Sequence, residues 1–183
     1  LVGSEMCIRD RYGATPGHGI EWARLIVQWA LCSFANRDGA RPYIDAAEHL
    51  FARAVDDAWN ADGAEGLVYT TDWNGIPVVT DRMHWTAAES LNTAATLHAA
   101  TGEARYADWY ATFARYVDEH VIDHEGGSWF HQLDGGNHVI GTVWPGKSDL
   151  YHAFQSTLIP FLDPAVSLSL IHISEPTRLD VIS

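Results

Sequence analysis

Hydrophobic positions along the chain predict helices of two kinds that follow one another. Between residues 19 and 34, apolar side chains occupy almost every side of a helix, which is typical of a helix buried in a core. Between residues 42 and 59 they fall on one stripe, which is typical of an amphipathic helix packed over the first. Residues 36–39 carry the turn signals that end the first helix. We therefore predict an inner helix followed by an outer helix that begins at Pro42.

The same succession returns further along the chain. Residues 84–100 are small and apolar with single polar positions, and residues 104–121 carry an apolar stripe rich in aromatic residues. A third inner helix is expected to begin near Asp149. This internal repetition predicts an all-α ring of helical hairpins.

Two glycine-rich segments separate the predicted helix pairs. Residues 65–79 and 125–140 each begin with Glu-Gly and then contain Asp-x-x-Gly or Asp-Gly-Gly. These are hairpin signals among residues of high β propensity. The repeating unit is therefore an inner helix, an outer helix and a loop that carries a short β-hairpin.

Histidines stand at the start of each predicted inner helix, at positions 18, 84 and 152. In a ring of helical hairpins the inner helices all point the same way, so their N-terminal ends converge at one face. We therefore expect His18, His84 and His152 to surround one cavity. Helix N-termini also favour anionic or oxyanionic groups there.

The first histidine has a carboxylate beside it. His18 and Glu21 are three residues apart, so they share one face of a helix. A carboxylate in that position fixes the tautomer of an imidazole and raises its basicity. The alternative is a histidine at a helix start with a first-turn Glu that favours the helix dipole.

The second cluster contains His84, Trp85 and Glu89. Trp85 and Glu89 lie on one face of the Ala-rich inner helix. A carboxylate in such a helix should be paired or should face a polar cavity. The alternative is a Glu that faces solvent.

The third cluster lies within residues 143–155. His152 and Gln155 fall on one face of the helix that Asp149 is placed to cap. Aromatic and hydrogen-bonding groups precede them in the loop, namely Trp144 and Lys147. An aromatic platform with hydrogen-bonding groups suits a sugar; the alternative is an aromatic-rich edge of the core. That alternative is the better interpretation for four other tryptophans: Trp22, Trp29, Trp59 and Trp109.

Composition limits the possible partners. The chain has 183 residues, enough for one domain, and a formal net charge of −13. Such a charge disfavours nucleic acid and anionic membrane surfaces, and no apolar run is long enough to span a bilayer. The sequence contains no HExxH, Cys/His ligand spacing, GxSxG, P-loop or dinucleotide fingerprint. We expect no metal and no cofactor.

The two ends of the chain have an unusual relation. One DNA string can encode residues 2–11, and its reverse complement in a shifted frame encodes residues 168–177; the string resembles a transposon-type sequencing adapter. We therefore expect residues 1–12 and 167–183 to be non-native tails and residues 13–166 to be the native domain. Ordinary disordered termini are the alternative.

This interpretation changes the inventory of reactive side chains. Cys7 and His172 are excluded as candidate functional residues, because both lie in the expected tails. Cys32 then stands alone in an apolar helix, where we expect a small buried hydrophobe and no disulfide. The gene is expected to continue beyond both ends.

Three motifs together resemble one family. PGHGIEW, HWTAAE and KSDLYHAFQ are similar to the N-acylglucosamine 2-epimerase superfamily of sugar isomerases and epimerases. The KSDLYHAFQ form is most similar to its mannose isomerase and sulfoquinovose isomerase branch. The resemblance covers nearly all of residues 13–163 and implies part of an (α/α)6 barrel. It implies roughly the C-terminal half of such an enzyme, so we expect the fragment alone to be inactive.

The resemblance also implies roles for individual residues. His18 and His152 match the acid/base pair of the family, and Glu21 matches the carboxylate that accompanies the first histidine. Glu89 matches the carboxylate on the intervening inner helix. Gln155 stands where the N-acylglucosamine epimerases carry Arg, which favours a neutral or simple hexose over an N-acetylated sugar.

The function implied is aldose–ketose isomerisation of the mannose/fructose type through an enediol. His152 is expected to remove the C2 proton, and His18, oriented by Glu21, to assist ring opening and return a proton. The residues expected to contact the monosaccharide are Glu89, Gln155, Trp85, Trp144, His84 and Lys147.

Three other functions stay open. The same two histidines could catalyse 2-epimerisation of a free or N-acylated sugar. An (α/α)6 inverting glycoside hydrolase would instead use two carboxylates, such as Glu21 and Glu89. A non-catalytic sugar-binding or structural module is the third. We expect a cytoplasmic protein, and an oligomer is possible for the intact protein.

Overall fold

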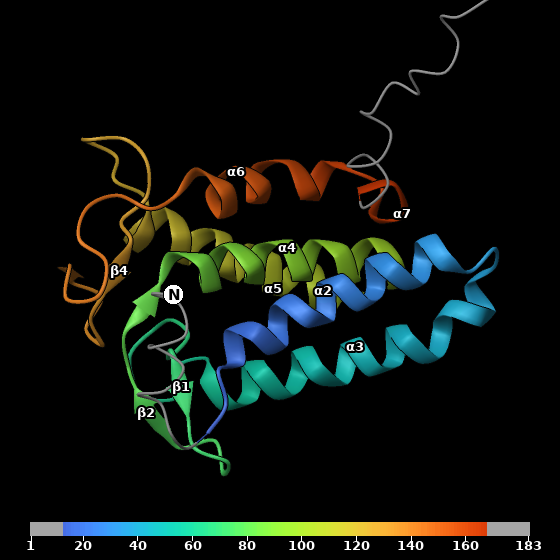
Figure 1. Ribbon diagram of the computed structural model, residues 1–183, viewed down its shortest axis with the longest axis horizontal. Helices are drawn as coiled ribbons and strands as arrows, with labels where there is room; N and C mark the ends of the chain where they lie inside the picture. Colours follow the sequence, from blue (N-terminus) through green and yellow to red (C-terminus); the bar gives the residue numbers. More distant parts are fainter. Residues whose placement is uncertain (1–12, 168–183) are drawn as a thin grey trace, which may run out of the picture.

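The computed structural model describes residues 13–167, which fold into two layers of helices (Figure 1). The long helices are α2 (Pro16–Ser33), α3 (Arg37–Ala58), α4 (His84–Thr101), α5 (Ala104–Tyr116) and α6 (Leu150–Leu158). Shorter helical segments are the π-helical turn Val117–Val121, the 3-10 turn Ile159–Phe161 and α7 (Pro164–Ser167). The expected tails lie outside the described residues apart from Ser167, and so do Cys7 and His172.

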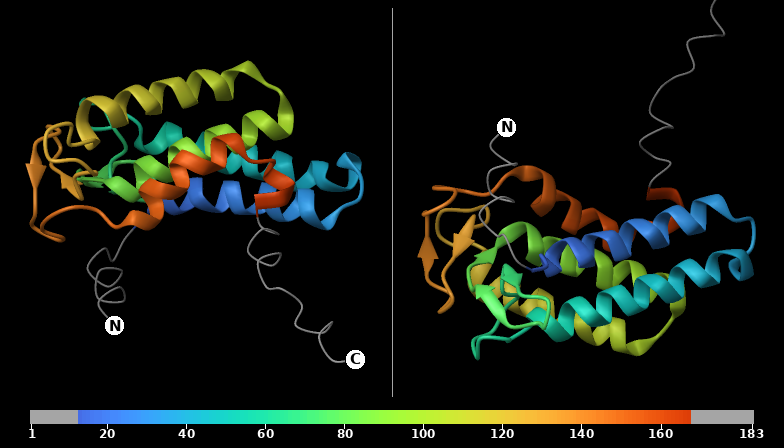
Figure 2. Two further views of the ribbon diagram at one scale, coloured as in Figure 1. Left: turned by 90° about the horizontal axis from the view of Figure 1, so that it is seen from above. Right: turned by 60° about the horizontal axis from the view of Figure 1, so that its bottom comes forward.

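The inner layer contains α2, α4 and α6, with α4 between the other two (Figure 2). Helix α3 packs along α2, and α5 packs along α4. The N-terminal ends of the inner helices lie at one end of the molecule, beside the strands (Figure 1). The predicted fold class, an all-α part of an (α/α)6 barrel with short hairpins in its loops, is confirmed.

Short strands form at the same end as the inner helix starts. The predicted hairpins are present: β1 (Thr70–Thr71) pairs with β2 (Pro77–Val79), and β4 (Gln132–Leu133) pairs with β5 (Val139–Ile140).

A further strand joins the two hairpin loops. β3 (Arg82–Met83) pairs antiparallel with β4, so that Met83 lies opposite Gln132. Its two residues are too few to give a pattern in the sequence. The pairing fixes the start of α4, because the backbone N–H of His84 donates to the carbonyl oxygen of His131 at 3.2 Å.

The core lies between the two layers. Phe51 of α3 and Phe113 of α5 are almost fully buried, with ring centroids 6.4 Å apart. Trp59 and Trp109 pack at the border of this core, as expected. The placement expected for Trp22 and Trp29 is wrong: their exposed fractions are 58% and 48%. They lie on α2, whose main helical neighbours in the described part of the chain are α3 and α4.

Two other expectations need correction. Cys32 is exposed instead of buried, and its thiol donates to the carbonyl oxygen of Ala165. The outer helix begins at Arg37 rather than Pro42, because the side chain of Asn36 accepts the backbone N–H of Gly39 at 2.9 Å and caps it. Within the described residues, no helix has both the length and the apolar character needed to cross a membrane.

Candidate active site

Two histidines from separate inner helices both lie close to one tryptophan. The ring centroids of His18 and Trp85 are 4.8 Å apart, and those of Trp85 and His152 are 6.2 Å apart. The indole is only 7% exposed, whereas the side chains of His18 and His152 are 56% and 22% exposed. Both imidazoles therefore reach solvent at the same end of the inner layer.

A glycine permits this approach of α2 to α4. A Cβ atom at Gly17 would stand 2.5 Å from Cγ2 of Thr86 and 2.9 Å from Cη2 of Trp85. Real Cβ atoms do not come that close, so a larger residue would push the two helices apart. The glycine before the histidine thus sets the distance between His18 and Trp85.

Glu21 accompanies His18 as the spacing predicted. Its Oε2 lies 3.3 Å from Nδ1 of His18. That hydrogen bond holds the pKa of Glu21 below its ordinary value, against the effect of burial, and the positive charges of His18, Arg24 and His152 act in the same direction. Glu21 is therefore a carboxylate that interacts electrostatically with both histidines.

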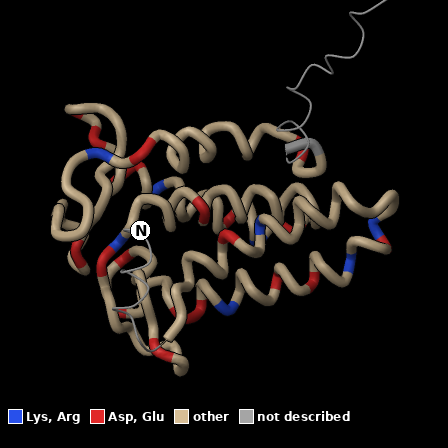
Figure 3. Tube along the Cα trace, in the orientation of Figure 1, with Lys and Arg blue, Asp and Glu red and all other residues tan. Residues whose placement is uncertain are grey.

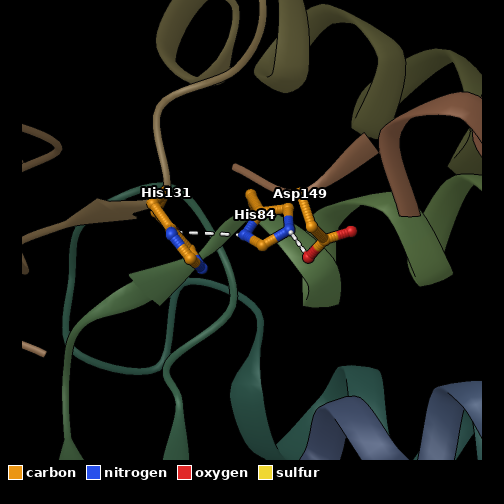
Figure 4. Close-up of side chains that lie close together, drawn as sticks. All are labelled: His84, His131 and Asp149. Atoms are coloured by element: carbon orange, nitrogen blue, oxygen red, sulfur yellow. Dashed lines mark hydrogen bonds and ion pairs between the residues drawn. The ribbon is translucent and has the colours of Figure 1, made fainter. Parts of the chain in front are cut away.

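Asp149 joins the starts of two inner helices. Its Oδ1 accepts the backbone N–H of His152 at 3.1 Å, which caps α6. Its Oδ2 lies 3.0 Å from Nε2 of His84, as Figure 4 shows. The cap was expected from the sequence, whereas the contact with His84 was missed because 65 residues separate the partners.

His84 has a different position from the one expected. It is 2% exposed and lies behind Asp149, between that carboxylate and His131 (Figure 4). In this placement His84 has little surface open to a sugar, and its role as a sugar contact stays a prediction. His131 itself carried no signal in the sequence, since it lies in a loop without periodicity.

Glu89 is fully buried and paired. Its Oε2 and Oε1 accept hydrogen bonds from Nε and Nη2 of Arg24 at 2.8 and 3.1 Å. Arg24 also donates from Nη1 to Oε1 of Gln28 at 3.0 Å. Glu89 is therefore paired, as one of the two expectations for a carboxylate in this helix requires, and its contact with a sugar hydroxyl stays a prediction. Arg24, a charged residue in the middle of the mostly apolar helix α2, was the signal that could have found this pair.

The loop residues expected at the site are engaged elsewhere. Lys147 forms an ion pair with Asp123 and lies over the Phe130 ring at 4.5 Å from its centroid, and its role as a sugar contact stays a prediction. Trp144 stacks on His131 with centroids 4.8 Å apart, so that it lies one ring beyond His84.

Gln155 is the remaining predicted contact. Its side chain lies one helical turn after His152 on α6 and is partly buried. Its Oε1 atom is inaccessible to solvent and has no hydrogen-bond partner among the described residues. A buried oxygen without a donor is unusual, so Gln155 keeps an unused acceptor.

The helix pairs and the histidines at the starts of the inner helices define part of a helical toroid with ionisable groups at one end. The chain matches the N-acylglucosamine 2-epimerase (GlcNAc 2-epimerase) family over residues 3–156, and it belongs to that family.

Relatives with higher identity carry a more specific name. The chain is 46% identical over 159 residues to a D-mannose isomerase of Pseudomonas cannabina pv. alisalensis and 43% identical over the same length to one of Thermobifida fusca. Each match covers 86% of this chain and 38% of the relative. The chain therefore spans less than half the length of the curated relatives it matches.

Solved structures agree with the fold. A crystal structure of D-mannose isomerase superposes with a TM-score of 0.70 at 30% identity, covering 81% of this chain and 37% of that one. The cellobiose 2-epimerase from Spirochaeta thermophila DSM 6192 gives a TM-score of 0.65 at 14% identity, covering 88% of this chain and 42% of that one. The second likeness concerns the fold alone.

Proposed function

We propose that this stretch is the histidine-bearing part of an aldose–ketose isomerase that interconverts mannose and fructose. The observation that carries the proposal is that His18 and His152 both lie beside Trp85, with side chains that are 56% and 22% exposed. Identity of 46% to a D-mannose isomerase supports the choice of sugar. The cytoplasmic location and the possible oligomer expected from the sequence belong to the same proposal.

The reaction moves one hydrogen from C2 to C1 of the open-chain sugar. His152 takes the C2 proton, and the electrons of that C–H bond form the C1=C2 double bond of an enediol while the C1 oxygen gains a proton. Loss of the C2 hydroxyl proton then forms the ketone as C1 accepts a proton. His18, oriented by Glu21, moves the proton on oxygen and assists ring opening. Histidine suits these transfers near neutral pH.

The surroundings favour a polar and uncharged substrate. The N-terminal ends of α2, α4 and α6 point to the same region, so their dipoles stabilise negative charge on the enediol oxygens. The indole of Trp85 supplies an apolar wall for a sugar C–H face. Gln155 supplies a neutral acceptor where an Arg would favour a charged or N-acylated group.

Two alternatives make different predictions. A 2-epimerase would use the same histidines but return the proton to C2, so mannose would give glucose. An inverting hydrolase would need two carboxylates open to water, and the burial of Glu89 against Arg24 disfavours it.

Product analysis tests the proposal. The full-length gene product is incubated separately with D-mannose, D-glucose and cellobiose, and the sugars are separated by chromatography. We expect fructose from mannose. Glucose as the product from mannose would identify an epimerase instead, and no conversion of any of the three sugars would contradict the proposal. The variant His138→Gln changes an imidazole that is exposed at a hairpin turn, away from the candidate site. It serves as a control and should give the same products as the parent.

A further inference from the structure

One carboxylate contacts two histidines at the start of the inner helices. Oδ2 of Asp149 lies 3.0 Å from Nε2 of His84, and Nδ1 of His152 lies 3.3 and 3.4 Å from the two carboxylate oxygens. The rings of His84 and His152 are 5.7 Å apart between centroids. Figure 4 shows Asp149 on one side of the His84 ring and His131 on the other. We call His84, Asp149 and His152 the relay cluster.

The geometry fixes which nitrogen of His84 carries hydrogen. Its Nδ1 lies 3.3 Å from the carbonyl oxygen of His131, which already accepts the backbone N–H of His84 at 3.2 Å. Its Nε2 faces a carboxylate oxygen, which can only accept. A neutral ring therefore places its single N–H on Nε2, where the bond to a charged acceptor is the stronger one.

We propose that His84 is a positioning residue for His152: it holds Asp149 through its Nε2–H, so that Asp149 accepts the Nδ1–H of His152 and leaves Nε2 of His152 free to exchange the substrate proton. This inference rests on the function proposed above. The carboxylate that is shared by the two imidazoles fixes the ring orientation and tautomer of the second one. Burial of His84 makes the arrangement rigid, because only a small rotation is open to a side chain packed on all sides.

The protonation states agree with this geometry. Burial lowers the pKa of His84 to about 4, although the Asp149 carboxylate opposes the shift, so the ring is neutral at pH 7. Burial raises the pKa of Asp149, but the backbone N–H of His152 and the imidazoles of His84 and His152 outweigh it and hold that pKa at about 2. Asp149 is therefore an acceptor for both rings across the working pH range.

An alternative role for these residues is to bind a metal ion. Donor atoms of His84, His131 and Asp149 all lie within 4.8 Å of one another. The hydrogen-bond geometry favours the relay, because Nε2 of His84 is already 3.0 Å from the carboxylate and the His131 ring is stacked on Trp144. The experiment below separates the two.

Two substitutions of His84 in the full-length gene product test the proposal. His84→Gln retains an N–H donor at a distance from Cα similar to that of Nε2. His84→Leu removes the donor but still fills the buried space with an apolar side chain. We expect His84→Leu to lower kcat for mannose about tenfold to a hundredfold with little change in KM, by analogy with other residues that orient a functional imidazole. His84→Gln should recover most of that loss. Asp149→Asn, which keeps an N-cap acceptor, should lower kcat at least as far.

A spectroscopic measurement keeps the test independent of activity. Imidazole ¹⁵N spectra, with the His152 signals identified from His152→Gln, should show a single Nδ1–H tautomer in the parent protein and in His84→Gln. In His84→Leu the two tautomers should be mixed. An unchanged single tautomer in His84→Leu would overturn the proposal even if the parent enzyme isomerises mannose, and so would full kcat in His84→Leu.

A zinc titration tests the alternative that His84, His131 and Asp149 bind a metal ion. ZnCl2 is titrated into the chelator-treated protein, and activity and ¹⁵N spectra are recorded. We expect no gain of activity, and we expect His84→Gln to behave like the parent. Activity that is lost with chelator, restored by Zn²⁺ and absent from His84→Gln would overturn the relay in favour of a metal site. Failure of the parent to convert mannose would bear on the proposed function, while the spectra would still decide the relay.

Discussion

Polar side chains without access to water connect the inner helices at the scale of single residues. Arg24 on α2 and Glu89 on α4 are 5% and 0% exposed and form two hydrogen bonds. A buried ion pair of this kind contributes little net stability, but loss of one partner leaves a charge in the core. The pair therefore fixes how α2 lies on α4, and with it the distance between His18 and Trp85.

The Arg24–Glu89 pair gives a prediction about stability. Arg24→Met should lower the free energy of unfolding by about 3–5 kcal/mol, because Glu89 is left without its partner. The double variant Arg24→Met/Glu89→Leu should recover most of that loss, since no charge is then buried. Urea denaturation measures both. Additive losses in the double variant would contradict the pairing.

Burial of His84 gives a prediction about pH. Its pKa falls from 6.5 to about 4 on folding, so the unfolded chain binds a proton in this interval that the folded chain does not. Stability is therefore retained above pH 6.5 and lost as the pH falls towards 4, by on the order of 3 kcal/mol from this one group. Denaturation at a series of pH values checks it.

The control for this prediction is His84→Gln. It removes the titrating ring, so the decline between pH 6.5 and 4 should become shallower by the same amount. Asp149 loses its contribution only at lower pH, because its pKa changes from 3.8 to about 2. An equal slope in the parent and in His84→Gln would show that His84 is not buried as a neutral ring.

The sequence predicted some of these residues and missed others for a physical reason. His18 with Glu21 could be found because a spacing of three residues is local and always places two side chains on one face of a helix. Contacts across the fold leave no such pattern. Arg24, the Asp149–His84 contact and the loop residue His131 were therefore missed.

At the scale of helices and strands, too, the predictions that succeeded rest on local patterns in the sequence. The alternating inner and outer helices and both hairpins could be predicted, since periodicity and Asp/Gly turn chemistry are local. The apolar stripe alone places the start of α3 at Pro42, whereas the Asn36 cap begins the helix at Arg37. The pairing of β3 with β4 depends on two loops meeting in space, which single-segment patterns cannot show.

The cap of α3 gives a prediction at this scale. Asn36→Ala should lower the free energy of unfolding by about 1 kcal/mol, because the backbone N–H of Gly39 loses its acceptor. Thr15 precedes α2 in the equivalent position but makes no side-chain cap bond, so Thr15→Ala is a matched control. Thermal denaturation compares the two. An equal loss in both variants would contradict the capping role of Asn36.

At the scale of the whole molecule, the two edges of the inner layer are strongly apolar. Helix α6 contains no Lys, Arg, Asp or Glu (Figure 3), and Leu150 and Phe154 are 79% and 60% exposed. On α2, Trp22 is 58% exposed. Apolar surface of this extent marks a contact region or promotes association.

These edges predict that the 183-residue chain self-associates in dilute buffer. Sedimentation velocity over a range of concentrations should show species larger than the monomer. The double variant Trp22→Lys/Phe154→Lys should shift the distribution towards monomer, whereas His138→Lys, at an exposed hairpin turn, should not. A parent chain that stays monomeric at all concentrations would contradict this prediction.

The claim that two histidines act on one sugar can be measured directly by comparing turnover with binding. In the full-length gene product, His18→Gln and His152→Gln should each lower kcat for mannose by about 10²–10⁴, the usual contribution of one acid/base group. The dissociation constant for mannose, measured by calorimetry, should change only a few-fold in both. Retention of near-parental kcat in either variant, while mannose still binds, would contradict the account.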